Sequence, residues 1–343
     1  MSDLVIHRPE GLYCPAGDFF IDPWRPVARA LVTHAHSDHA RRGHEAYLCA
    51  EPGASLLRAR LGDIVLQGVA YGERLRCKDA WVSFHPAGHV LGSAQIRIEV
   101  DGDVCVVSGD YKLEPDPTCA GFEPVPCRTF ISESTFGLPI YRWLPADQLL
   151  ADVNRWWQGN TERGRTSLLL CYALGKAQRL LAGLDTGIGP VLIHGAMATL
   201  NDIYRAEGIA LPPTRLATEV SEKSDLMRAI VLAPPSAAGS PWARRFVDPS
   251  LGFASGWMQI RGARRQRRVE QGFPISDHAD WPGLLEAIDG TGAERVLITH
   301  GRGDALVRYL NERGVQAQTM NLDYGDEDAD AMLHADHSMP SAP

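Results

Sequence analysis

Short apolar runs separated by turn residues fill the first part of the chain, a pattern that predicts β-strands. Strands are predicted at residues 27–33, 46–50 and 130–132, with a helix at 54–61. Asp101-Gly102 separates two further apolar runs and is typical of a tight β-hairpin turn. The expected hairpin strands are residues 95–100 and 103–107.

The pattern changes near residue 142, where helical and strand-like segments begin to alternate. Such alternation predicts a parallel sheet covered by helices. The expected helices are 147–157, 176–184 and 198–207, and the expected strands are 167–172, 190–194 and 230–233. Residues 273–276, a helix at 281–288 and a strand at 295–299 are expected to rejoin the first part.

These patterns predict an α/β protein with a discontinuous first domain, residues 1–141 and 269–322, interrupted by an insertion of residues 142–268. Residues 323–343 are acidic and aperiodic, and we expect them to be a disordered tail.

Composition indicates a globular protein, because 45% of the residues are hydrophobic and 22% are charged. No apolar run has the length of a membrane span, and residues 1–11 lack the pattern of a secretory signal, so we expect a cytoplasmic protein without membrane contact. The seven cysteines form no C-x-x-C pair. They are therefore expected to be reduced thiols rather than disulfides or zinc ligands.

A cluster of metal-ligating side chains, His34-Ala-His36-Ser-Asp38-His39, directly follows a predicted strand. Imidazole and carboxylate groups suit zinc, and they also bind manganese or iron. Four such groups within six residues cannot all surround one tetrahedral ion comfortably, which favours two ions.

Three more candidate ligands each follow an apolar strand or lie in a glycine-rich loop: His89 in PAGHVLGS, Asp110 in SGDY and His300 in LITHG. Taken alone, each is more typical of a structural residue. Together with the first cluster they predict a site for two divalent metal ions, with Zn²⁺ preferred and Mn²⁺ as the alternative.

The pattern H-x-H-x-D-H followed by a later His, Asp and His resembles the metallo-β-lactamase superfamily. The resemblance implies an αββα sandwich in which His34, His36, His89 and Asp110 hold one metal ion. Asp38, His39, His300 and the shared Asp110 would hold the other. Asp22, in Ile21-Asp22-Pro23, matches an aspartate that orients the metal loop without binding metal.

Further motifs resemble the β-CASP branch of that superfamily, whose members are DNA and RNA nucleases with an inserted Rossmann-like domain. In chain order they are ESTFG from Glu133, ALGKAQR ending at Arg179, SDHAD around His278, and His300. The resemblance implies a two-metal phosphodiesterase in which Asp38, Asp110, Glu133 and His278 carry the catalysis.

The formal net charge of −8 argues against a polyanionic substrate. A local run of arginines at residues 261–268, the arginine run, favours one. Such a run can be no more than a solvated face, yet beside a metal centre we expect it to contact phosphates. Lys176 and Arg179 open a predicted helix after Gly175 and are also expected to contact phosphate, although an ordinary helix start is the alternative. The expected substrate-binding residues are Lys176, Arg179, Ser276, Arg264, Arg265, Arg267 and Arg268.

Up to about residue 322 the motif order resembles bacterial ligase-associated DNA exonucleases. This implies a DNA exonuclease of DNA repair that acts on nucleic acid beside an ATP-dependent DNA ligase. One residue favours RNA instead, because DNA cross-link repair members usually have valine where this chain has His300. The remaining alternatives are an RNA-processing nuclease, a lactamase- or thioesterase-type hydrolase of small molecules, and an inactive scaffold subunit.

Overall fold

The computed structural model describes residues 3–260, 262, 269–301 and 303–320, which form two compact units. The first combines Met1–Arg142 with His278–Pro343, and the second is Trp143–Asp277. The arginines at 264, 265, 267 and 268 and the expected tail at 323–343 lie outside the described residues. None of the helices in the described part of the chain is long and apolar enough to cross a membrane.

The first unit contains a pair of sheets. One has the strand order β1-β2-β3-β4-β5-β6, and the other has the order β19-β18-β11-β10-β9-β8-β7. The strands of the first sheet are β1 (Ile6–Arg8), β2 (Gly11–Cys14), β3 (Phe19–Ile21), β4 (Arg29–Val32), β5 (Ala46–Ala50) and β6 (Leu66–Val69). The strands of the second are β7 (Leu75–Cys77), β8 (Ala80–Pro86), β9 (Ala94–Val100), β10 (Asp103–Val107), β11 (Thr129–Ser132), β18 (Arg295–Ile298) and β19 (Gln316–Thr319).

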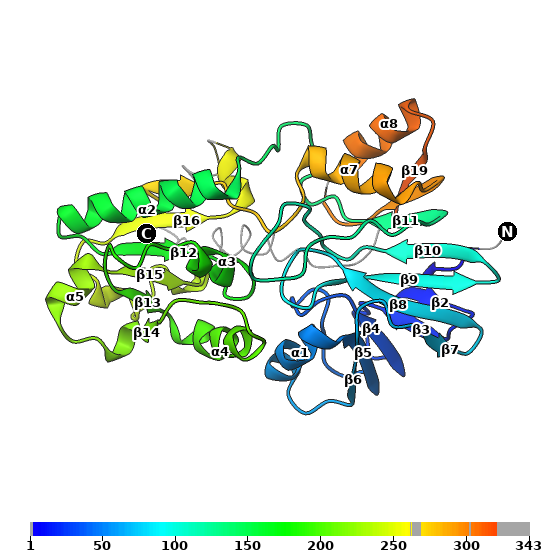
Figure 1. The fold of residues 1–343 in the computed structure, drawn as a ribbon, viewed down its shortest axis with the longest axis horizontal. Coiled ribbons are helices and arrows are strands. Elements are labelled where there is room, and N and C mark those ends of the chain that lie inside the picture. The colour runs from blue at the N-terminus through cyan, green and yellow to red at the C-terminus, as the bar shows by residue number, and fades with distance from the viewer. Residues whose placement is uncertain (1–2, 261, 263–268, 302, 321–343) are drawn as a thin grey trace, which may run out of the picture. The chain divides into compact units, whose positions relative to one another are not determined.

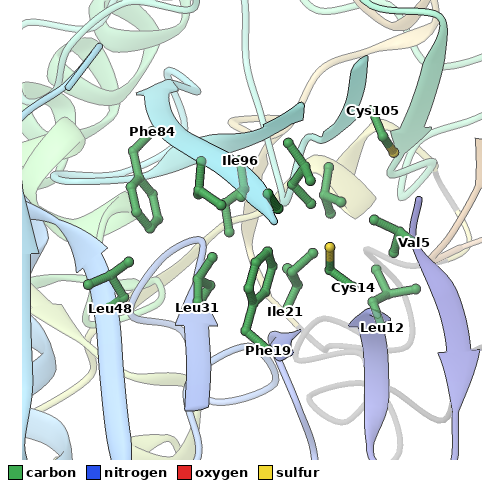
Figure 2. Packing of buried hydrophobic residues seen from close by; sticks show 14 of the residues in the cluster. Val5, Leu12, Cys14, Phe19, Ile21, Leu31, Leu48, Phe84, Ile96 and Cys105 are labelled. Carbon is green, nitrogen blue, oxygen red and sulfur yellow. The ribbon is translucent and has the colours of Figure 1, made fainter. Parts of the chain in front are cut away.

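Apolar side chains from the two sheets meet in a shared core. Figure 2 shows Phe19 and Leu31 of the first sheet pointing toward Phe84 and Ile96 of the second, and all four are buried. Burying a side chain of this size contributes about 1.5–3 kcal/mol. The free energy of this core therefore holds the sheets face to face.

Helices cover the outer surfaces of this pair of sheets. Helix α7 (Trp281–Thr291) and α8 (Asp304–Glu312) pack Leu284 and Leu306 against Phe130 of the second sheet, and α1 (Ala54–Leu61) lies beside β6 (Figure 1). The predicted α/β sandwich is confirmed in this arrangement of layers.

The second unit is built on a parallel sheet with the order β14-β13-β15-β12-β16-β17. Leu168 and Leu170 face one side of this sheet and Leu169 faces the other, so both faces are apolar and both are covered. The strands are β12 (Ser167–Leu170), β13 (Val191–Ile193), β14 (Arg215–Leu216), β15 (Ile230–Ala233), β16 (Ser250–Ala254) and β17 (Gln271–Phe273). The helices are α2 (Ala146–Glu162), α3 (Lys176–Ala182), α4 (Ala198–Ala206) and α5 (Lys223–Arg228).

The segment after the arginine run differs from its predicted place. Residues 271–273 form β17, which pairs in parallel with β16 and so belongs to the sheet of the second unit. This unit therefore continues past residue 268 to Asp277. Phe273 is buried against the same core as α2, and its apolar character gave no sign of which sheet it would join.

The hairpin between β9 and β10 is confirmed, with Asp101 and Gly102 at φ values of 51° and 82°. Positive φ at both central residues is the requirement of the tight turn predicted from this dipeptide.

A second glycine, Gly92, lies in the loop between β8 and β9 that carries His89, and it also has a positive φ, 74°. Unlike Gly102, it packs directly on backbone, because a Cβ at Gly92 would lie 2.2 Å from the Cα of Gly53.

These two glycines allow a matched test of close packing. Gly102→Ala should cost about 1 kcal/mol of unfolding free energy, because a Cβ there adds strain at positive φ but meets no neighbour. Gly92→Ala should cost about 2 kcal/mol more, because Gly53 must also move. Urea denaturation of both variants gives the comparison, and equal losses would show that the approach of Gly92 to Gly53 does not matter.

Candidate metal centre

The candidate ligands and their neighbours follow strands that end at a common edge. Asp110 follows β10, Glu133 follows β11 and His300 follows β18. These three strands are parallel neighbours, so their carboxyl ends meet. In the other sheet, β3 and β4 are also parallel, and Asp22 and the loop from His34 follow their ends. The fold itself thus gathers residues that lie far apart in the sequence.

One group of donor atoms has the spacing of ligands around a single ion. The Nδ1 atom of His36 lies 3.1 Å from Nε2 of His34 and 3.0 Å from Nε2 of His89. Oδ2 of Asp110 lies 3.5 Å from Nε2 of His34 and 3.8 Å from Nε2 of His89. Atoms that bind one zinc ion at about 2.1 Å in tetrahedral geometry lie about 3.4 Å apart. The donors therefore fit a divalent metal ion in both chemistry and spacing.

A second set of donors adjoins the first and shares Asp110. Nε2 of His39 lies 3.5 Å from Oδ2 of Asp38 and 3.4 Å from Oδ2 of Asp110. The ring of His300 stacks on that of His39 with centroids 5.0 Å apart. His39, Asp110 and His300 form one compact group of donor atoms, and Asp38 joins His39 and His34 in another. Asp110 is thus common to the two sides of the centre.

Asp22 fixes the positions of Thr33 and His39 through hydrogen bonds. Its Oδ1 accepts a hydrogen bond from the backbone N–H of Thr33 (2.8 Å), and its Oδ2 accepts one from the Thr33 hydroxyl (2.6 Å). Oδ2 also lies 2.7 Å from Nδ1 of His39, so the Nε2 atom of that ring is the one directed at Asp110. Gly109 must lack a side chain here, since a Cβ would lie 2.6 Å from Cβ of Thr33.

Burial and charge act in opposite directions on these groups. Burial alone would raise the pKa of Asp110, but His39 and His278 hold that pKa well below its ordinary value. Burial alone would lower the pKa of His39, but Asp110, Asp38 and Asp22 raise it well above its ordinary value. Burial lowers the pKa of His34, which keeps that imidazole neutral and available as a ligand.

Glu133 and His278 form a hydrogen-bonded pair next to Asp110. Nδ1 of His278 lies 3.0 Å from Oε2 of Glu133 and 4.0 Å from Oδ2 of Asp110. Glu133 is fully buried and also accepts hydrogen bonds from the backbone N–H of Tyr111 (2.7 Å) and the hydroxyl of Thr135 (2.6 Å). The carboxylate is therefore held by several donors, and it fixes the orientation of the His278 ring.

The phosphate contacts of Lys176 and Arg179 stay a prediction, and in the structure both cations bind the chain itself. Nζ of Lys176 lies 3.1 Å from Oδ1 of Asp277, and Nη1 of Arg179 donates to the carbonyl of Ser276 (3.0 Å). All four residues are buried within the second unit. The predicted arginines at 264, 265, 267 and 268 lie outside the described residues.

Sequence reasoning missed Thr33, Tyr111 and Thr135, which hold Asp22 or Glu133 in place. Two of them were open to inference. Thr33 is the last residue before His34, and Thr135 lies two residues after Glu133, a spacing at which a hydroxyl commonly bonds a neighbouring acceptor. Tyr111 acts through its backbone N–H, which no residue type could have indicated.

The following three proteins are among those that share sequence with this chain. A probable DNA ligase of Opitutus terrae is 33% identical over 97% of this chain and 33% of its own length. An RNase J-like protein of Methanocaldococcus jannaschii is 26% identical over 52% of this chain and 50% of its own. The endoribonuclease YSH1 of Candida glabrata is 35% identical over 31% of this chain and 14% of its own.

These relatives confirm the resemblance of the chain to the β-CASP branch of the metallo-β-lactamase superfamily that was inferred from its motifs. No family model matches the chain. It spans about a third of the Opitutus protein and half of the Methanocaldococcus protein, so each relative contains a large part with no counterpart here.

Asp22 offers a direct test of the support behind the metal centre. Asp22→Asn keeps the shape of the side chain but weakens its hold on His39, and we expect the affinity for Zn²⁺ to fall about 10-fold to 100-fold. Competition with a chromophoric chelator measures that affinity. The control is Asp18→Asn, which alters another aspartate at positive φ whose partners are Tyr13 and Lys78. Equal affinities of the two variants would contradict the role given to Asp22.

Proposed function

We propose that this chain is a metal-dependent nuclease that hydrolyses phosphodiester bonds, and that it acts as a DNA exonuclease in repair beside a DNA ligase. The observation that carries the proposal is the convergence of donor atoms from His34, His36, His89 and Asp110. Oδ2 of Asp110 also lies 4.0 Å from Nδ1 of His278, the ring that Glu133 binds. The second unit is proposed to be the inserted β-CASP domain.

His34, His36, His89 and Asp110 would hold one divalent ion, zinc or manganese, and His39, Asp110 and His300 would hold another. Asp38 would supply a second carboxylate on the His39 side. When bound, such ions would lower the pKa of a water molecule and neutralise negative charge on the phosphoryl oxygens.

His278 would deliver the proton that the leaving oxygen needs. Nδ1 of His278 faces the Glu133 carboxylate, which would accept a hydrogen bond from it, and this leaves Nε2 as the atom that can protonate a departing group. Glu133 also stabilises the positive charge of the ring before that transfer. The Glu133 carboxylate accepts hydrogen bonds from the backbone N–H groups of Tyr111 and Thr135 and from the Thr135 hydroxyl, and these bonds would keep Glu133 in place during the reaction.

The choice of DNA rests on the extent of the match to the probable DNA ligase, which covers nearly the whole of this chain. A functional link between cleavage here and sealing by a ligase would explain why a protein named as a probable DNA ligase contains a region similar to this chain. RNA is the second candidate. The relatives named RNase J-like protein and endoribonuclease favour it, and so does His300.

Cleavage of matched single-stranded DNA and RNA, each labelled at the 5′ or the 3′ end, tests the proposal. Protein of known metal content is assayed with Zn²⁺ and with Mn²⁺. We expect metal-dependent shortening of DNA in preference to RNA, with mononucleotides released first from one labelled end. Preferential or internal cleavage of RNA would instead support the RNA-processing function, and hydrolysis of nitrocefin or an acyl-glutathione without nucleic-acid cleavage would overturn both.

Asp38→Ala should reduce cleavage at least about 1000-fold, because it removes a carboxylate from the centre where charge develops. Ser37→Ala, one residue away in the same loop and exposed, should retain the wild-type rate. Circular dichroism shows whether each variant is folded. A folded Asp38→Ala protein that cleaves at the wild-type rate would exclude this site as the centre of the reaction.

A further inference from the structure

Two basic residues of helix α3 hold the residues that directly precede His278. Lys176 and Arg179 lie three positions apart, so they project from the same face of the helix. Lys176 pairs with the side chain of Asp277, and Arg179 donates to the carbonyl of Ser276. Both cations thus bind consecutive residues of one segment, immediately before the ring that Glu133 holds.

The ion pair is deeply buried, with side-chain exposures of 2% for Lys176 and 3% for Asp277. Nζ of Lys176 also lies 4.8 Å from the centre of the Tyr172 ring, which adds a favourable cation–π contact. A buried ion pair adds little net stability, because desolvation offsets much of its attraction. Its effect is to fix geometry, since a displaced partner would leave an isolated charge inside the protein.

The residues after His278 are fixed as firmly from the first unit. The backbone N–H of Ala279 donates to the carbonyl of Tyr111 (2.7 Å), and Asp280 caps helix α7 by accepting from Gly283 (3.0 Å). The chain passes from the second unit to the first between Asp277 and His278. His278 therefore begins the segment that the first unit holds, and the residues that α3 holds directly precede it in the chain.

We propose that Lys176 and Arg179 are positioning residues for His278: by holding Asp277 and the carbonyl of Ser276, they set the position from which the His278 ring reaches Glu133. This assignment rests on the proposed function for its kinetic consequence. It gives the ALGKAQR motif a role that does not involve touching the substrate.

Lys176→Met tests the assignment, because methionine fills a similar volume without the charge. We expect kcat to fall about 100-fold with KM changed less than about twofold, since the loss concerns alignment of a reacting group. Lys176→Arg should recover most of the rate. In a His278→Ala background the same Lys176→Met change should alter kcat less than about twofold, because the residue through which it acts is gone.

Arg165→Met is the matched control. It removes the ion pair of Arg165 with Glu270. Arg165 lies just before the amino-terminal end of β12, whereas Lys176 lies beyond the carboxyl end of the same strand. It should destabilise the second unit without changing kcat. An equal loss of rate in Arg165→Met, or an undiminished effect of Lys176→Met on His278→Ala protein, would reduce the ion pair to a structural element and overturn the assignment.

A second measurement does not depend on any activity. In ¹⁵N-histidine-labelled, metal-loaded protein, the Nδ1 proton of His278 bonded to Glu133 should give a downfield resonance that is absent from His278→Ala. His39, bonded to Asp22, gives a similar resonance in the first unit and serves as an internal reference. Lys176→Met should shift or broaden the His278 signal and leave that of His39 unchanged.

The two measurements separate the two proposals. If Lys176→Met shifts or broadens the His278 signal but wild-type protein cleaves no nucleic acid, the positioning role stands and the proposed function is rejected. An unchanged His278 signal in folded Lys176→Met protein would reject the positioning role, whatever the wild-type activity. If Lys176→Met does not fold, Asp277→Asn provides the same comparison from the other partner.

Discussion

The burial of one carboxylate, that of Asp110, is the constraint on which the rest of the centre depends. A charge removed from water is tolerated only where opposite charges or strong donors surround it. Here the imidazoles of His34, His39, His89 and His278 all lie within 4.0 Å of its Oδ2 atom. Four separate segments must therefore meet at the same place. Parallel strands bring Asp110 and the loop from His34 there, whereas His89 comes from the loop between the antiparallel strands β8 and β9.

Two buried carboxylates, those of Asp22 and Glu133, orient histidine rings of the centre through similar sets of hydrogen bonds. On one side Asp22 binds the backbone and hydroxyl of Thr33 and directs the ring of His39. On the other, Glu133 binds a hydroxyl and a backbone N–H and directs the ring of His278. Each acid follows a strand parallel to one that leads into the centre. Ring orientation is thus determined by the sheets rather than by the loops.

The sequence was most informative where the signal was local. The Asp101-Gly102 turn and the six-residue run from His34 to His39 could be interpreted from adjacent residues, because a turn type and a ligand cluster each depend on nearby chemistry. The ion pair of Lys176 could not be predicted, because its partner, Asp277, lies about a hundred positions away and nothing near α3 indicates a buried anion. The same limit hid β17, whose short apolar pattern fits either unit.

The order of these residues along the chain also has a consequence for biosynthesis. A ribosome releases His34 and Asp110 early, but His278 and His300 emerge only after the whole second unit has been translated. Strand β18 must then insert beside β11 to complete the centre. A nascent chain that has not yet exposed these residues consequently lacks part of the donor cluster, so the centre is completed only after the second unit has been synthesised.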